Sequence, residues 1–253
     1  MVTFSEAQLM GWLTPLLWPF LRALALLATL PVFSQRSVPM RVKVGLAMFI
    51  AVALQPMLPP TEPVALDSPQ AMLMVVQQLV IGLSMGFAAR IVFAAAEMGG
   101  ELVGLQMGLN FAGFFDPVTA SQGTATARFF GTLVSFLFIL LNGHLMVVGV
   151  LAHSFEEFRI GEEPFAFIRQ TAPHVWGAEV FSLGLWLALP LVGMLLFLNL
   201  VMGVISRVAP QISIFSVGFP ITLGVGLAGM LLTLPLMERP FTAALERMME
   251  YFR

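Results

Sequence analysis

The chain has 253 residues, of which 58% are hydrophobic and only 10% are charged, and its mean hydropathy is +0.93. Soluble domains carry roughly 25% charged residues, so this composition indicates an integral membrane protein. The net charge of −2 and the single lysine, Lys43, provide no basic field, and we exclude nucleic acid as a partner. The absence of cysteine excludes disulfides and thiolate metal sites.

About six apolar segments have the length that crosses a bilayer. In chain order they are residues 9–31, 42–58, 72–96, 129–150, 180–205 and 221–236. None alternates like a barrel strand, so we predict an all-α membrane protein whose long hydrophobic helices form kinked hairpins. Prolines within or at the ends of these segments are expected to kink them and to free carbonyls for neighbouring helices; they are Pro15, Pro19, Pro190 and Pro235.

Basic residues predict the topology of these segments. Arg36, Arg41 and Lys43 cluster around the first connection, whereas the second connection carries Glu62 and Asp67 without lysine or arginine. Because basic residues accumulate on the cytoplasmic side, we predict that the first connection is cytoplasmic.

The third apolar segment is unusually long. Helical character extends over residues 72–108, roughly 55 Å at ~1.5 Å per residue, whereas a bilayer core is about 30 Å thick. We therefore expect either a break near Gly99 and Gly100 or a helix that projects into an assembly deeper than the lipid.

One face of this segment combines charged and small residues. The stripe consists of Arg90, Glu97 and Glu101 with Gly86, Gly104 and Gly108. One interpretation is an internal Arg90–Glu97 pair in a packed bundle, and the other is a subunit interface or a wet lumen. Charges at such depth avoid lipid in both interpretations.

Arg22 poses the same question in the middle of the first segment. An unpaired cation there is costly, so we expect a carboxylate or carbonyl partner on another helix or subunit, and we assign Arg22 to a subunit interface or lumen. Snorkelling to the membrane surface is the alternative.

Two further segments have amphipathic patterns. Residues 153–176 intersperse aromatic with acidic side chains, and residues 240–253 place apolar side chains at helical spacing. The second stripe consists of Phe241, Ala244, Leu245, Met248, Met249 and Phe252. We expect both segments to dock on lipid headgroups or protein, with the membrane surface as the first interpretation.

Enzymatic motifs are not supported. Ser84 lies between Gly82 and Gly86 in a formal G-x-S-x-G pattern, but that motif requires a turn between strand and helix. Inside an apolar helix the two glycines are better interpreted as a helix-packing pair. The three histidines lack metal spacing, and no phosphate loop or dinucleotide fingerprint occurs, so we predict neither enzyme activity nor a cofactor.

The segment GLQMGLNFAGFFDPVTASQG, residues 104–123, lies between two span-length runs. It carries three phenylalanines beside an Asp-Pro pair, followed by a tract without bulky side chains. Irregular backbone at membrane depth is found where protein buries it or where it lines a wet cavity, so function is to be sought here. A bulky tip on a flexible stem could close a pore, and an ordinary interfacial aromatic loop is the alternative.

Three stretches carry a resemblance to a known family. They are PVFSQRSVPMRVKVGLA at residues 31–47, GGELVGLQMGLNFAGFFDP at 99–117 and SRVAPQISIFSVGFPITLGVGL at 206–227. In this order and spacing they resemble the FliR family of type III secretion export-gate membrane proteins, which includes injectisome counterparts. The resemblance covers nearly the whole chain. Its most specific part is the third stretch, because membrane insertion alone does not demand its Arg-x-x-Pro-Gln and Gly-Phe-Pro patterns.

The resemblance implies an architecture. Residues 1–176 would correspond to a FliP-like part that contains a plug loop at 108–123, and residues 177–253 to a FliQ-like helical hairpin with an amphipathic C-terminal helix. The hairpin connection would contain Arg207, Pro210, Gln211, Phe215, Gly218 and Pro220.

The resemblance also implies a function and partners. Such subunits assemble with FliP-type and FliQ-type proteins, beside FlhB-type and FlhA-type export proteins, into a closed channel for unfolded flagellar proteins. The channel lies in the bacterial inner membrane at the flagellum basal body. Phe111, Phe114 and Phe115 would occlude it, because an aromatic constriction excludes water and ions while yielding to a threading chain.

Other residues of the plug loop have supporting roles in this hypothesis. Gly108 and Gly113 would supply mobility, and Asp116 and Pro117 would set a turn. Two alternatives to the flagellar gate are an injectisome homologue and a small-molecule secondary transporter. Proline-interrupted helices and the stripe of Arg90, Glu97 and Glu101 motivate the transporter.

Overall fold

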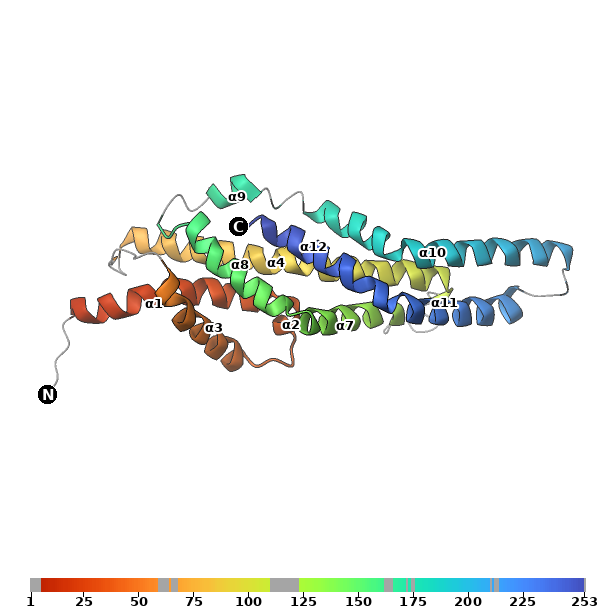
Figure 1. The fold of residues 1–253 in the computed structure, drawn as a ribbon, viewed down its shortest axis with the longest axis horizontal. Helices are drawn as coiled ribbons and strands as arrows, with labels where there is room; N and C mark the ends of the chain where they lie inside the picture. Colours follow the sequence, from red (N-terminus) through yellow and green to blue (C-terminus); the bar gives the residue numbers. More distant parts are fainter. Residues whose placement is uncertain are drawn as a thin grey trace. The chain divides into compact units, whose positions relative to one another are not determined.

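The computed structural model describes residues 6–58, 64, 68–109, 123–161, 166–171, 173, 176–209, 211 and 214–252 (Figure 1). Within these ranges the regular structure is helical and contains no strand. The main helices are α1 (Glu6–Thr29), α2 (Pro31–Ser34), α3 (Met40–Leu54), α4 (Pro69–Gln106), α7 (Ala125–Leu140), α8 (Gly143–Glu157), α9 (Ala166–Thr171), α10 (Gly177–Val208), α11 (Phe219–Thr233) and α12 (Glu238–Glu250). The all-α membrane architecture is thereby confirmed.

Short helical turns join some of these elements. A 3-10 turn, Gln55–Met57, follows α3, and a second one, Leu234–Met237, joins α11 to α12. A π-helical turn, Ile214–Gly218, precedes α11. Pro15 and Pro19 lie inside α1 and Pro190 lies inside α10, as the sequence indicated.

Four helical stretches in the described residues are long and apolar enough to cross a membrane, or up to five if α7 and α8 count as one broken span. The four are Met40–Met57, Pro69–Gln106, Gly177–Val208 and Ser216–Glu250. The first predicted segment contains a shorter apolar helix, Thr14–Thr29.

One expectation about helix continuity is wrong, and one of two alternatives for α4 is excluded. The predicted segment 129–150 is not one helix, because α7 ends at Leu140 and α8 begins at Gly143. Between them Asn142 has a left-handed φ of 57°, a conformation that asparagine tolerates better than most residues. Conversely, α4 does not break near Gly99 and Gly100, since it runs uninterrupted from Pro69 to Gln106.

The contacts of the chain divide it into two compact units. Unit 1 comprises Met1–Arg90, Asn142–Trp176 and Leu245–Arg253, and unit 2 comprises Ile91–Leu141 and Gly177–Ala244. The units therefore interleave along the chain. The FliP-like and FliQ-like character of the two expected parts stays a prediction.

In unit 1, α4 packs on α1 through a pair of glycines. A Cβ atom at Gly82 would overlap the carbonyl oxygen of Arg22 and lie 2.8 Å from Cβ of Ala25. A Cβ atom at Gly86 would overlap the hydroxyl of Thr29 and lie 2.8 Å from the carbonyl oxygen of Leu26. The interpretation of this G-x-x-x-G pair as a packing device is confirmed.

A cluster of aromatic side chains packs the C-terminal segment into unit 1. Phe167 of α9 stacks on Phe252 near the C-terminus with 5.5 Å between ring centroids, and Trp176 meets the same ring at 5.8 Å. The apolar stripe predicted for residues 241–252 is buried at every position. Its first interpretation, binding to the membrane surface, is corrected to packing inside the protein. The same correction applies to Phe155, Phe158 and Trp176.

In unit 2, α10 and α11 lie side by side as a helical hairpin (Figure 1). The core gathers side chains from the end of α4, from α7, from this hairpin and from the 3-10 turn after it: Val103, Met107, Phe130, Ala188, Leu191, Leu195, Met230 and Met237. Close backbone approach joins α4 to α10, because a Cβ atom at Gly184 would lie 2.8 Å from the carbonyl oxygen of Ala95.

Candidate functional site

The tip of the predicted plug loop lies outside the described residues. This applies to Phe111, Gly113, Phe114, Phe115, Asp116 and Pro117, so their assignment stays a prediction. The structure describes both ends of the loop, Gly108 and Leu109 on one side and Gly123 and Thr124 on the other, and all four belong to unit 2.

Both ends of the plug loop are glycines in left-handed backbone conformations. Gly108 has a φ of 78° just after the end of α4, and Gly123 has a φ of 81° just before α7. Helices commonly end with a glycine in this conformation, because other L-residues pay a steric cost there. The two glycines thus provide the turns by which the chain leaves α4 and enters α7.

The entry to α7 is held by a set of side chain to backbone bonds. The N–H of Thr124 donates to Oε1 of Glu101 on α4 at 2.9 Å. Oγ1 of Thr124 in turn accepts the N–H of Ala127 at 3.1 Å, which makes Thr124 the N-cap of α7. The hydroxyls of Thr124 and Thr126 are 2.9 Å apart and hydrogen-bonded.

A second glycine pair on α4 seats α7. A Cβ atom at Gly100 would lie 2.8 Å from the Cα atom of Ala127, and one at Gly104 would overlap the hydroxyl of Thr126. Gly100 and Gly104 thus have the same four-residue spacing as the pair that seats α1 in unit 1. This close contact places α7 where the carboxylate of Glu101 reaches its N-cap residue, Thr124.

A pocket of about 340 Å³ adjoins the start of the plug loop in unit 2. The end of α4, the C-terminal part of α10 and the start of α11 line it, with Met107, Gly108, Met202 and Phe219 among the walls. Asn199 of α10 closes one side, since its amide donates to the carbonyl and to the side-chain oxygen of Gln106 at 3.2 and 3.3 Å.

The charged stripe on α4 is only partly buried. Arg90 and Glu97 are exposed, and Glu101 is half-buried. The side chain of Glu97 lies against Gly131 of α7, where a Cβ atom would be 2.8 Å from Oε1. The placement of Arg90, Glu97, Glu101 and Gly104 at a lumen or subunit interface concerns an assembly, so it stays a prediction.

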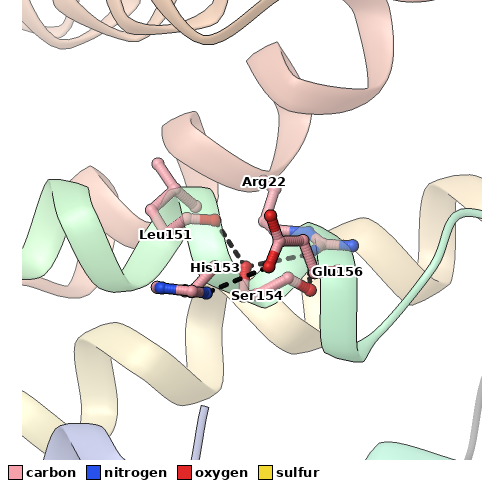
Figure 2. A network of polar contacts seen from close by, with 5 residues as sticks. All are labelled: Arg22, Leu151, His153, Ser154 and Glu156. Atoms are coloured by element: carbon pink, nitrogen blue, oxygen red, sulfur yellow. Dashed lines mark hydrogen bonds and ion pairs between the residues drawn. The ribbon is translucent and has the colours of Figure 1, made fainter. Parts of the chain in front are cut away.

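Arg22 lies in unit 1 and is completely buried (Figure 2). Its Nε donates to Oε1 of Gln78 on α4 at 2.7 Å. One terminal nitrogen donates to the carbonyl and hydroxyl of Ser154 at 2.6 and 2.9 Å, and the other to the carbonyl of Phe158 at 3.0 Å. The guanidinium also lies 3.8 Å from the centroid of the Phe155 ring.

These contacts explain how the chain buries the cation. Ser154 belongs to the last turn of α8 and Phe158 follows that helix, so their carbonyls lie at the negative end of the helix dipole. The expected carbonyl partner on another helix is confirmed, and snorkelling is wrong. The assignment of Arg22 to a lumen or subunit interface concerns the assembly and stays a prediction.

Gln77 extends the same network to the turn that follows α8. Its amide nitrogen donates to the carbonyl of Arg159 at 3.0 Å, and its oxygen accepts the N–H of Gly161 at 3.1 Å. His153 and Glu156 form a separate exposed pair at 3.2 Å on the surface of α8 (Figure 2).

The predicted hairpin connection is described only in part. Arg207 is exposed in the last turn of α10, Gln211 and Pro220 are exposed, and Gly218 is buried. Pro210 and the side chain of Phe215 lie outside the described residues. In the part of the chain that is described, no group of three His, Asp or Glu side chains could hold a metal ion.

The sequence interpretation missed Thr124, Gln78, Ser154 and Asn199. Thr124 could have been found, because a threonine directly before an apolar helical run is an N-cap signal. Nothing local marks the other three, because each is defined by a partner on a different helix.

Helices of this length and apolarity define a multi-pass membrane protein, and residues 13–248 match the family described as bacterial export proteins, family 1. The chain is 44% identical over 244 residues to the flagellar biosynthetic protein FliR of Escherichia coli (strain K12), covering 95% of this chain and 92% of that protein. It is 43% identical over 242 residues to FliR of Pectobacterium carotovorum subsp. carotovorum, with 95% and 92% covered.

A more distant relative also matches most of the chain. FliR of Bacillus subtilis (strain 168) is 26% identical over 213 residues, which cover 81% of this chain and 80% of that protein. The chain therefore belongs to the FliR family of bacterial export proteins. The resemblance inferred from the three sequence stretches is confirmed, and the chain is a membrane protein of the flagellar export apparatus.

Proposed function

We propose that this chain is a non-enzymatic structural subunit of the flagellar type III export gate. Together with FliP-type and FliQ-type subunits it forms the closed channel through which unfolded flagellar proteins leave the cytoplasm. The observation that carries this proposal is family membership over residues 13–248. FlhB-type and FlhA-type proteins are the neighbouring export components, and the site of assembly is the inner membrane at the flagellum basal body.

The closing element in this proposal is the plug loop, residues 108–123, with Phe111, Phe114 and Phe115 as the occluding side chains. Two features of the described residues support it. Glycine turns bound the loop, at Gly108 and Gly123. The second end is bonded to α4, because the N–H of Thr124 donates to Glu101, so both ends of the loop adjoin the same helix.

Co-purification tests the assembly. The tagged chain, expressed with FliP-type and FliQ-type subunits, is expected to purify with both in a fixed ratio. A chain that purifies alone and carries a small solute across vesicles would support the secondary transporter instead.

Leakage tests the plug. Alanine at Phe111, Phe114 and Phe115 should leave the complex assembled but let ions cross reconstituted vesicles, because the hydrophobic constriction is removed. The matched control replaces three exposed phenylalanines on α7 and α10 with alanine: Phe136, Phe181 and Phe197. Vesicles as tight as those with the wild-type complex, or equal leakage in the control, would refute the plug.

A further inference from the structure

The outer face of α3 is apolar and exposed. It consists of Gly45, Met48, Phe49 and Val52, which follow one another at helical spacing. A Cβ atom at Gly45 would meet nothing within 4 Å, and Phe49 is 78% exposed. On its other face α3 packs on α1, and the residues that it buries are Ala47, Ile50, Ala51 and Leu54. Within the described residues, the chain therefore covers one side of α3 and leaves the outer face open.

The length of this helical stretch fits a bilayer. Met40–Met57 has 18 residues, which at ~1.5 Å per residue give about 27 Å, close to the ~30 Å of a hydrocarbon core. Only 17% of these residues are buried, against 61% in the equivalent window of α4. Most of the surface of α3 is thus left for another molecule to cover.

Positive charge gathers at one end of α3. Arg36 and Arg41 are exposed and Lys43 is half-buried, and no ion pair joins any of them to another described residue. Residues 30–58 contain no Asp or Glu, and the far end of the stretch is uncharged. The basic end is also the start of the helix, where the N-cap Pro39 offers no side-chain acceptor and the helix dipole is positive. An anion is therefore favoured at this end alone.

Both features match a phospholipid. Acyl chains cover an apolar helix face of this length, and a negatively charged headgroup complements the basic end. The basic end belongs to the first connection, which the distribution of basic residues predicts to be cytoplasmic. The cytoplasmic leaflet is also where anionic lipids attract basic segments beside a membrane helix.

We propose that Arg36, Arg41 and Lys43 bind the headgroup of an anionic phospholipid whose acyl chains lie along the outer face of α3. The site selects its lipid by headgroup charge. This inference goes beyond the proposed function and does not depend on it, because neither the plug loop nor a transported chain takes part.

The test measures which lipids lie beside α3 in the co-expressed complex. The chain has no cysteine, so Met48→Cys places a single fluorophore on the outer face, about 10 Å along the helix from Arg41. The complex without this cysteine gives the background. The vesicles contain phosphatidylglycerol and phosphatidylcholine in equal amounts, with bromine quenchers on the acyl chains of one lipid or the other.

We expect phosphatidylglycerol to be enriched at least about fivefold over phosphatidylcholine beside Met48→Cys, which is the attraction that one basic residue near an anionic surface supplies. The matched position is Leu227→Cys on the exposed surface of α11. Residues 208–237 carry no charge, so this position should show no enrichment.

A triple variant removes the basic end: Arg36→Gln, Arg41→Gln and Lys43→Gln. Its enrichment beside Met48→Cys should fall to about twofold or less. A control variant loses the same charge at three exposed arginines outside α3 and should keep the enrichment: Arg159→Gln, Arg207→Gln and Arg247→Gln. With all basic residues intact, raising the salt concentration from about 0.05 to about 0.5 M should also lower the enrichment, because exposed charges are screened. If the triple variant does not assemble, this salt dependence decides.

Three results would overturn the inference. The first is equal quenching by the two lipids, or an enrichment that neither the triple variant nor salt lowers. The second is an equal loss in the control variant, because net charge would then be responsible. The third is the absence of quenching by either lipid, which would mean that a protein partner covers the outer face. None of these results bears on the plug, which the leakage of vesicles tests separately.

Discussion

Replacement of Arg22 by methionine tests the largest polar network in unit 1. Methionine keeps much of the length and packing volume but has no donor. Four hydrogen bonds are lost, to Gln78, to the carbonyl and hydroxyl of Ser154, and to the carbonyl of Phe158. The carbonyls at the end of α8 are then left buried without this donor.

The size of the effect follows from these contacts. Interhelical hydrogen bonds in membrane proteins contribute about 0.6 kcal/mol each on average, so four of them give a lower bound of about 2 kcal/mol. The Ser154 carbonyl keeps the N–H of Phe158 as a donor, so the Phe158 carbonyl is the group that loses its donor. One buried polar group left unsatisfied costs about 1–3 kcal/mol, which added to the lower bound gives an upper bound of about 5 kcal/mol. We expect Arg22→Met to lower the free energy of unfolding of unit 1 by about 2–5 kcal/mol.

Thermal and denaturant unfolding of the purified complex in detergent measures this loss. Trp18 and Trp176 are buried in unit 1, so their fluorescence reports on the unfolding of that unit. Arg247→Met, at an exposed position of α12, removes the same charge without a buried network and is expected to change stability by less than about 0.5 kcal/mol. A free energy of unfolding for Arg22→Met within that margin of wild type would refute the reasoning.

Two other substitutions test the packing of unit 1 with the same measurement. Gly86→Ala should destabilise by about 1–3 kcal/mol, because the new Cβ overlaps Thr29, whereas Gly45→Ala meets nothing within 4 Å and should be neutral or stabilising; equal effects at the two glycines would contradict the close approach of α4 to α1. Phe252→Ala should cost about 3–5 kcal/mol, because its buried ring packs on Phe167 and Trp176. If Phe252→Ala costs no more than Phe49→Ala at an exposed position of α3, the C-terminal segment is not docked as described.

The helical segments and their apolar faces could be predicted because both depend on local composition and periodicity. The stripe from Phe241 to Phe252 repeats at helical spacing, and every member is buried. Its partner could not be predicted, because a membrane surface and a protein surface select the same apolar pattern. The structure shows that the partner is protein, because Phe252 packs on the rings of Phe167 and Trp176, which lie far away in the sequence.

Helix continuity shows the limits of residue type as evidence. Gly99 and Gly100 suggested a break, but α4 is continuous there. The absence of side chains at these two positions lets α7 and α10 approach the backbone of α4, and this packing stabilises the helix. The sequence did not predict a helix end at Asn142, which lies inside an apolar run, yet the chain turns at this residue. A glycine in a helix costs only about 1 kcal/mol, which close packing offsets.

The plug loop was located from its residues and from a family resemblance. The contact that holds its second end was seen only in the structure. Glu101 was singled out for its charge on a helical stripe. Its bond to Thr124 joins residues separated by 23 positions, and no spacing rule connects them. Arg22 and Ser154, which are 132 positions apart, illustrate the same point more strongly.

The sequence by itself determined the class of protein, the helical segments, the buried face of the C-terminal helix and the family. Each of these follows from composition, from the helical period or from contiguous motifs, which are properties of neighbouring residues. Only the tertiary structure decided which oxygens receive the Arg22 guanidinium, which helices the glycine pairs of α4 seat, and where Glu101 finds its donor. A hydrogen bond or a close helix contact between distant segments depends on how far apart their atoms lie in the folded chain, and local sequence does not encode that distance.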